Sequence, residues 1–133
     1  MSAVPIERVN PPDLHSTPGY HHVTVVPAGR LAFLAGQCPL DTSGAVVGEG
    51  DVLAQVDQVV ANTLRALAAV GAGPADVVRT VIYVVGDDLG AVWRRFRASP
   101  LAPAFESAST LLGVARLGFT GQLVELDVTA ALA

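Results

Sequence analysis

Two adjacent segments in the middle of the sequence constrain the fold most strongly. Between Asp51 and Gly71, apolar residues recur at three- and four-residue spacing, which predicts an amphipathic helix with Asp51 as its N-cap and Gly71 at its end. The run Val77–Val85 follows at once and is too rich in β-branched residues for a stable helix. It predicts a central strand, so we expect the helix to bury its apolar face on a sheet.

The second half of the chain supplies the next elements. Asp87-Asp88 predicts the start of a shorter helix whose apolar face carries Leu89, Val92, Trp93 and Phe96, with Arg94, Arg95 and Arg97 outside. Two strand-like runs, 107–114 and 123–128, follow and are joined by a glycine turn. Glu125 lies inside the second run. A carboxylate there must face water, find a partner or serve a site.

The first half is less regular. Four prolines between residues 4 and 19 predict an extended, irregular lead-in without a helix. Residues 22–26 and 31–37 read as strands of a hairpin around a turn at 28–30, and residues 45–47 as a very short strand after a loop. On the long helix, Gln55 and four other polar residues are expected largely off the apolar face. The order of elements predicts an α+β sandwich, with both helices on one face of a mixed sheet.

Composition limits the classes of protein. The 133 residues fit a single domain, 1–133, and 51% hydrophobic residues against 15% charged ones favour burial of the open sheet face in a subunit interface. A net charge of −4 with scattered arginines disfavours nucleic acid. No apolar run approaches the roughly 18 residues of a membrane span, and a lone cysteine suits a reducing compartment. We expect a cytoplasmic protein without a membrane anchor.

No ready-made catalytic motif is present. The sequence lacks a phosphate-binding GxxxxGK loop, a GxSxG elbow and a CxxC pair. Adjacent His21 and His22 point to opposite faces of a strand, so we expect no metal site, and no cofactor is indicated. Cys38 is interpreted as a small hydrophobe, and Ser109 as a strand hydroxyl, because no activating base or cation adjoins either.

A succession of short motifs nevertheless runs along the sequence. The motifs are Asn10-Pro11, Pro18-Gly19-Tyr20, residues 34–40, Gly44, Gln55, Asn62, Leu67, Gly71, residues 76–80, 114–117 and 123–126. Their order and spacing resemble one family, the Rid family, also called YjgF-type or reactive-intermediate-deaminase proteins. The resemblance covers nearly the whole chain. It implies a chorismate-mutase-like α+β fold, a homotrimer with three pockets at subunit interfaces, and a small-molecule ligand such as a carboxylate.

The resemblance also implies an activity and a site. Active members hydrolyse imines or enamines to carbonyl compounds and ammonia, with an arginine that holds the carboxylate and a glutamate-associated water. Matching Val114–Leu117 places Ser109 where that arginine would stand, and Ala35 replaces a frequent serine. Glu125 is the expected catalytic residue. The expected substrate-binding residues are Tyr20, Gly36, Gln37, Ser109 and Leu111, with Cys38 and Phe105 as further pocket candidates.

The lost arginine leaves two hypotheses open. The first is a deaminase-type hydrolase or tautomerase of altered specificity, in which Glu125 positions water or transfers a proton. The second is a non-catalytic trimeric protein that binds a small ligand or a partner. A structural role for Glu125 at an interface also stays open. A ribonuclease activity, once associated with the family, is a weaker third reading because of the acidic charge.

Overall fold

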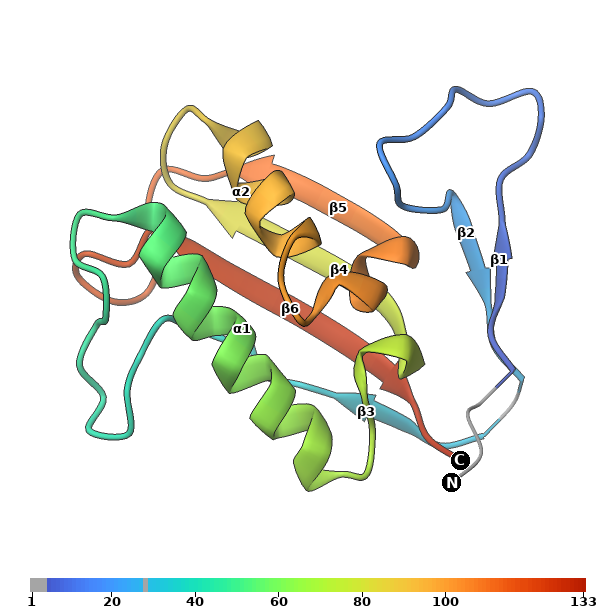
Figure 1. Cartoon of the computed structure of the whole chain (residues 1–133), viewed down its shortest axis with the longest axis horizontal. Coiled ribbons are helices and arrows are strands. Elements are labelled where there is room, and N and C mark those ends of the chain that lie inside the picture. The colour runs from blue at the N-terminus through green and yellow to red at the C-terminus, as the bar shows by residue number, and fades with distance from the viewer. Residues whose placement is uncertain (1–4, 28) are drawn as a thin grey trace.

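The computed structural model describes residues 5–27 and 29–133. Val4 of the expected lead-in and Ala28 of the expected turn lie outside the described residues. The chain forms a four-stranded sheet, a separate pair of short strands and two helices (Figure 1). The elements are β1 Glu7–Val9, β2 Val23–Val25, β3 Leu31–Phe33, α1 Val52–Ala69, the 3-10 turn η1 Pro74–Asp76, β4 Val77–Val84, α2 Leu89–Arg97, the 3-10 turn η2 Ala102–Glu106, β5 Ala108–Gly113 and β6 Val124–Ala131.

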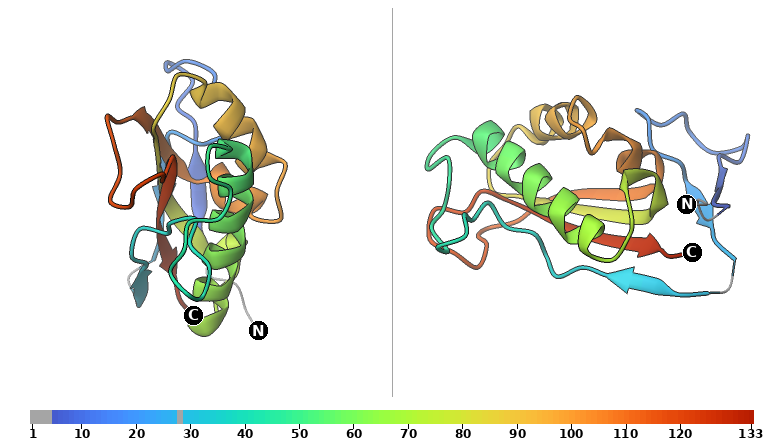
Figure 2. Two further views of the ribbon diagram at one scale, coloured as in Figure 1. Left: turned by 90° about the vertical axis from the view of Figure 1, so that its left-hand side faces the viewer. Right: turned by 60° about the horizontal axis from the view of Figure 1, so that its bottom comes forward.

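The four-stranded sheet is mixed and has the order β3-β6-β4-β5. Strand β4 pairs antiparallel with β6 and parallel with β5, so it is the central strand that its β-branched sequence predicts. The two terminal strands are therefore not neighbours, since β4 lies between them. Both helices cover the same face, as the side view in Figure 2 shows. The predicted α+β architecture is confirmed.

Helix α1 begins and ends where its capping residues predict. The Asp51 carboxylate accepts the amide N–H of Ala54, and Gly71 takes the left-handed conformation, φ 74°, that follows many helices. Its apolar stripe is buried against the sheet. Gln55, expected off that stripe, is fully buried instead, because its amide bonds three backbone groups of neighbouring loops.

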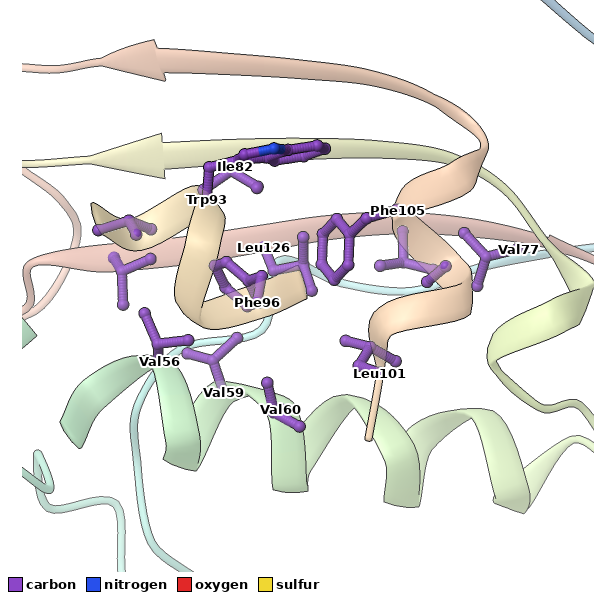
Figure 3. Close-up of a cluster of buried hydrophobic side chains, with 14 of the residues drawn as sticks. Val56, Val59, Val60, Val77, Ile82, Trp93, Phe96, Leu101, Phe105 and Leu126 are labelled. Atoms are coloured by element: carbon purple, nitrogen blue, oxygen red, sulfur yellow. The ribbon is translucent and has the colours of Figure 1, made fainter. Parts of the chain in front are cut away.

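The core lies between the helices and the sheet (Figure 3). Asp88 caps α2, and the helix buries Val92 and Phe96 beside Phe105 of η2. The rings of Phe96 and Phe105 lie 5.0 Å apart. Full burial of such a side chain contributes about 1.5–3 kcal/mol. The apolar segment before β5 therefore packs on the core and covers part of it.

The expected hairpin between residues 22–26 and 31–37 is wrong. Strand β2 pairs with β1 at Glu7–Val9, inside the lead-in that was expected to be irregular, and β3 pairs with β6. Pairing with β6 joins β3 to a sheet with a buried face, which an isolated two-stranded hairpin would lack. The short strand expected at 45–47 is reduced to one bridge between Leu40 and Val46.

The uncovered face of the sheet carries both charged and apolar side chains. On β6, Val124, Leu126 and Val128 point into the core, so Glu125 and Asp127 between them point to the open face. Phe33 of β3, which pairs with Thr129 beside them, is 76% exposed. Among the described helices, none is long and apolar enough to cross a membrane.

Candidate functional site

A hollow of about 810 Å³ lies between α2, the edge strand β5 and the segment around Tyr20. We call it the tyrosine pocket. It is lined by Pro18, Tyr20, Gly90, Trp93, Arg94, Arg97, Ala98, Ser109, Thr110 and Leu111. Three of the predicted substrate-binding residues, Tyr20, Ser109 and Leu111, are thus brought together although 89 positions separate the first two (109 − 20).

Helix α2 positions the segment that carries Tyr20. The indole N–H of Trp93 donates to the Pro18 carbonyl at 3.3 Å, and the Arg97 guanidinium donates to the Gly19 carbonyl at 3.1 Å. The Tyr20 ring then meets Trp93 edge-to-face at 6.1 Å, and its hydroxyl lies 3.2 Å from the His15 ring nitrogen. The tyrosine is therefore held from both ends of its side chain.

Ser109 faces the pocket but its hydroxyl is occupied within the fold. It accepts a hydrogen bond from Thr80 at 2.6 Å and donates to the Ser107 carbonyl at 3.1 Å. A hydroxyl has one donor and two acceptor positions, so a single acceptor position remains for a ligand. This strand position gives the pocket no charge.

The charge of the pocket comes from α2. Both Arg94 and Arg97 line it, and the Arg97 guanidinium lies 5.9 Å from the centre of the Trp93 ring. Their neighbour Arg95 points elsewhere and forms a salt bridge with Asp57 at 2.6 Å. Within residues 5–27 and 29–133, no carboxylate forms a salt bridge with Arg94 or Arg97.

A second group surrounds Glu125, and we call it the glutamate cluster: Gly36, Cys38, Gln122 and Glu125. The backbone of Gln37 pairs with Leu126, through N–O distances of 2.7 and 3.1 Å, which places Gly36 and Cys38 beside the carboxylate. Any Cβ at Gly36 would overlap Glu125. The glycine is thus required here for space.

The Glu125 carboxylate is bound by uncharged donors. Its Oε1 atom accepts the amide N–H of Gln122 at 3.1 Å and the thiol of Cys38 at 3.4 Å. No arginine in the described part of the chain forms a salt bridge with it. Burial, the negative charge of Glu125 and the hydrogen bond to it raise the pKa of the Cys38 thiol to about 11. The thiol is therefore protonated at neutral pH and is a hydrogen-bond donor, not a nucleophile.

The tyrosine pocket and the glutamate cluster lie on opposite faces of the sheet. Ser109 pairs with Thr80, whose side chain is buried under the helices, whereas Glu125 pairs with Tyr83 on the open face. Gly36, Gln37 and Cys38 line a separate hollow of about 510 Å³. One chain therefore does not bring Tyr20 and Ser109 together with Gly36 and Glu125.

The remaining candidates have structural surroundings. Phe105 is fully buried and does not line the pocket, but its ring supports Trp93 edge-to-face at 5.7 Å. The rings of His21 and His22 bond the carbonyl oxygens of Glu106 and His15. In the part of the chain that the structure describes, no three His, Cys, Asp or Glu side chains are grouped as metal ligands.

Sequence reasoning missed several residues of both groups. The assignment of Trp93 to the core face of its helix is confirmed, since its side chain is buried, but its place on the pocket wall was not predicted. Arg94 and Arg97 were assigned to the outside. The helical spacing of 93 and 97 does place these two side chains on one side, at the border between the apolar and polar faces. Nothing in the sequence marked Gln122 as a site residue, because its hydrogen bond to Glu125 depends on how the loop before β6 folds.

Fold and site define a class: an α+β protein with helices on one face of a mixed sheet, a pocket at the edge strand and a carboxylate on the open face. Residues 13–132 match the family model described as Endoribonuclease L-PSP. The chain belongs to this family, the Rid or YjgF family, as its sequence motifs indicated.

Individual relatives agree with this assignment. Protein DfrA of Myxococcus xanthus is 35% identical over 118 residues, which cover 84% of this chain and 83% of that protein. The structure of YyfB from Yersinia pestis, a Rid protein of unknown function, superposes with a TM-score of 0.85 at 32% identity, over 96% of this chain and 98% of that one. Rv2704 of Mycobacterium tuberculosis, a YjgF/YER057c/UK114 member, gives a TM-score of 0.60 at 30% identity, over 86% and 88%.

Proposed function

We propose that this protein hydrolyses a small imine or enamine to a carbonyl compound and ammonia, or tautomerises it, in a pocket formed between copies of the chain. The observation that carries the proposal is the Glu125 carboxylate, which β6 presents on the open face and which, among the described residues, accepts hydrogen bonds from the uncharged Gln122 and Cys38. The family resemblance supplies the reaction class.

The surroundings of Glu125 suit proton transfer. Its Oε1 atom is occupied by Gln122 and Cys38, whereas no hydrogen bond within the described residues reaches Oε2. Oε2 lies in the space that a Cβ at Gly36 would occupy, directly against the glycine backbone. A water molecule bound to Oε2 would be activated by a base whose orientation the other oxygen fixes.

The hydrolysis can be written with these groups. The substrate enters as a protonated iminium. Glu125 accepts a proton from water while the water oxygen bonds to the iminium carbon. Glu125 then passes this proton to the substrate nitrogen. Ammonia leaves as the C–N bond breaks. The proton on the newly added hydroxyl passes to Glu125 as the carbonyl forms, and Glu125 then releases it to solvent. For an enamine, proton transfer to the neighbouring carbon precedes these steps.

The separation of the two groups supports an assembly of several copies. The tyrosine pocket contains the binding candidates Tyr20, Ser109 and Leu111 on the helix-covered side, whereas the glutamate cluster contains Gly36 and the proposed base on the open side. A second copy that packs its open face against the first copy's pocket would unite them, as the homotrimer implied by the family does. Closed rings of identical subunits use such heterologous contacts.

Release of ammonia tests the proposal directly. Purified protein is offered a panel of 2-imino acids and enamines generated in situ, and ammonia is measured beside the Glu125→Gln variant. We expect wild-type activity and a loss of about 10²–10⁴-fold in the variant, which keeps the shape and removes the base. Equal rates in both proteins would remove Glu125 from its role. A stable ligand complex without turnover would favour the non-catalytic alternative, which the loss of the family arginine at Ser109 supports.

The family description also names an endoribonuclease activity. Ribonucleases that bind their substrate tightly need a basic surface to neutralise phosphates. With 12 acidic residues against 8 basic ones, this chain lacks that charge balance. We therefore do not adopt this activity for the chain.

A further inference from the structure

Among the described residues, Arg94 and Arg97 of α2 form no salt bridge, and both line the tyrosine pocket. We propose that Arg97, supported by Arg94, binds the carboxylate of the ligand, and that the ligand carries an aromatic or bulky apolar group that packs on Trp93. This inference rests on the proposed function only in taking the tyrosine pocket as the ligand site. It assigns the anion-binding role to a helix, although the strand position at Ser109 carries no charge.

Helix α2 carries more positive charge than its salt bridge within the described residues neutralises. All three arginines of α2 lie within four residues, yet only Arg95 forms a salt bridge in the described part of the chain. Arg97 is half-buried, so its charge is partly withdrawn from water. An uncompensated, partly buried cation attracts an anion more strongly than a fully solvated one.

The Arg97 guanidinium is held in place before any ligand binds. One Arg97 N–H is fixed on the Gly19 carbonyl, and the guanidinium lies directly against Gly19, where any side chain would collide with it. Gly19 has a φ of 123°, which other residues rarely adopt. A guanidinium has five N–H donors, so the others remain available in a fixed plane. A fixed fork of donors matches the two oxygens of a carboxylate.

An apolar surface lies next to the Arg97 guanidinium in the tyrosine pocket. Trp93 and Leu111 line the same pocket, and Tyr20 meets Trp93 at its edge. A hollow of about 810 Å³ is larger than the smallest imino acids need. The combination of one cationic end and an aromatic wall selects amphipathic anions over small polar ones.

Binding of phenylacetate tests the proposal without any turnover. Isothermal titration calorimetry compares this anion with its neutral counterpart phenylacetamide, on wild type, Arg97→Gln and Arg95→Gln. We expect phenylacetate to bind wild type and Arg95→Gln at least about ten-fold more tightly than the amide, and Arg97→Gln to lose this preference. Arg95→Gln is the matched control, because it removes a cation from the same helix outside the pocket.

The amide also reports whether the pocket is intact. Arg97→Gln also loses the hydrogen bond to the Gly19 carbonyl, so the ratio of acid to amide affinity is compared rather than either affinity alone. Arg97→Lys, which keeps the charge but loses the planar fork, should retain part of the preference for the acid. A preference that survives in Arg97→Gln would overturn the proposal, as would equal affinity of acid and amide for wild type. Wild type would bind the acid and the amide equally well if a carboxylate of a second copy neutralised Arg97.

The two proposals fail separately. Ammonia release from imines without any preference for phenylacetate would overturn the assignment of Arg97 and leave the proposed reaction standing. A clear preference for phenylacetate without ammonia release from any imine would do the reverse.

Discussion

At the scale of single residues, Gly36 decides where the Glu125 carboxylate lies. The glycine has no special backbone conformation, so its value lies in the missing Cβ. The carboxylate fills that space and stays near the backbone of the segment that pairs with Leu126. A residue of this kind changes function without contributing a functional group.

Gly36→Ala should therefore reduce activity while the fold survives. The added methyl group overlaps the carboxylate and must displace it, so we expect at least a ten-fold lower rate of ammonia release, since misplaced catalytic groups are costly. Gly118→Ala is the control, because a Cβ there meets no atom within 4 Å. Comparable rates for the two variants, at similar melting temperatures, would contradict the role of Gly36.

Cys38 should report the charge of Glu125. Because burial and the carboxylate raise its pKa from 9.0 to about 11, the thiolate is scarce at neutral pH. At pH 8 a pKa of 11 leaves on the order of 0.1% thiolate, so alkylation by iodoacetamide should be slow and should accelerate up to about pH 11. Glu125→Gln removes the repelling charge, lowers the pKa and should speed alkylation at pH 8. A wild-type rate profile with its midpoint near 9 would contradict the contact.

At the scale of elements, α1 shows how a polar residue can be part of a core. Gln55 has no exposed surface, donates to the Gly48 and Gly121 carbonyls and accepts the Leu123 N–H. These bonds tie the helix to the loop before it and to the loop that leads into β6. The position of Glu125 depends on that second loop.

Gln55→Leu should destabilise the protein strongly. The substitution keeps the volume but leaves two carbonyls and one N–H without partners, for which we expect a loss of about 2–4 kcal/mol in the free energy of unfolding. Denaturant titration measures it. Gln58→Leu, a half-buried neighbour on the same helix, should cost less than about 1 kcal/mol. A similar cost for both would show that burial of Gln55 is unimportant.

The elements themselves could be predicted where the signal is local. Both helices begin at aspartates that cap them, and Val77–Val84 is the central strand, because capping and β-branching act within a few residues. Strand pairing could not be predicted. Strand β3 joins β6, which lies about 90 positions later, and nothing near Phe33 encodes that partner. The wrong hairpin follows from this.

The candidate site could be predicted only residue by residue. Family motifs indicated Tyr20, Ser109 and Glu125 as site residues. How these residues lie relative to one another depends on the pairing register of the strands, which places Ser109 and Glu125 on opposite faces of the sheet. The arginines of α2 carried a charge that the helical pattern assigned to solvent. Their relation to the pocket depends on how the Tyr20 segment folds across α2.

At the scale of the whole molecule, no layer formed by the described residues covers the second face of the four-stranded sheet (Figure 2). Phe33 is 76% exposed and Leu31 is 43% exposed on β3. Exposed large apolar side chains that are grouped together often mark interfaces. The composition, with 51% hydrophobic residues, agrees with further burial.

Phe33→Asp should therefore weaken self-association. A charge in an apolar interface loses its hydration without a partner, so we expect the native mass to fall from that of an oligomer to that of the 133-residue chain. Light scattering during size-exclusion chromatography measures it at micromolar concentration. Ala68→Asp, on the exposed side of α1, introduces the same charge away from the open face and should leave the mass unchanged. A monomeric wild type would argue against any pocket between copies.

The placement of Arg97 and Glu125 on opposite faces has a genetic consequence. If the chain forms the proposed trimeric ring, each pocket would take Arg97 from one subunit and Glu125 from the next. Subunits that carry Arg97→Gln and subunits that carry Glu125→Gln, each inactive alone, should complement one another when they are unfolded together and reassembled. Every mixed ring regains one intact pocket, so an equal mixture should recover about a quarter of the wild-type sites.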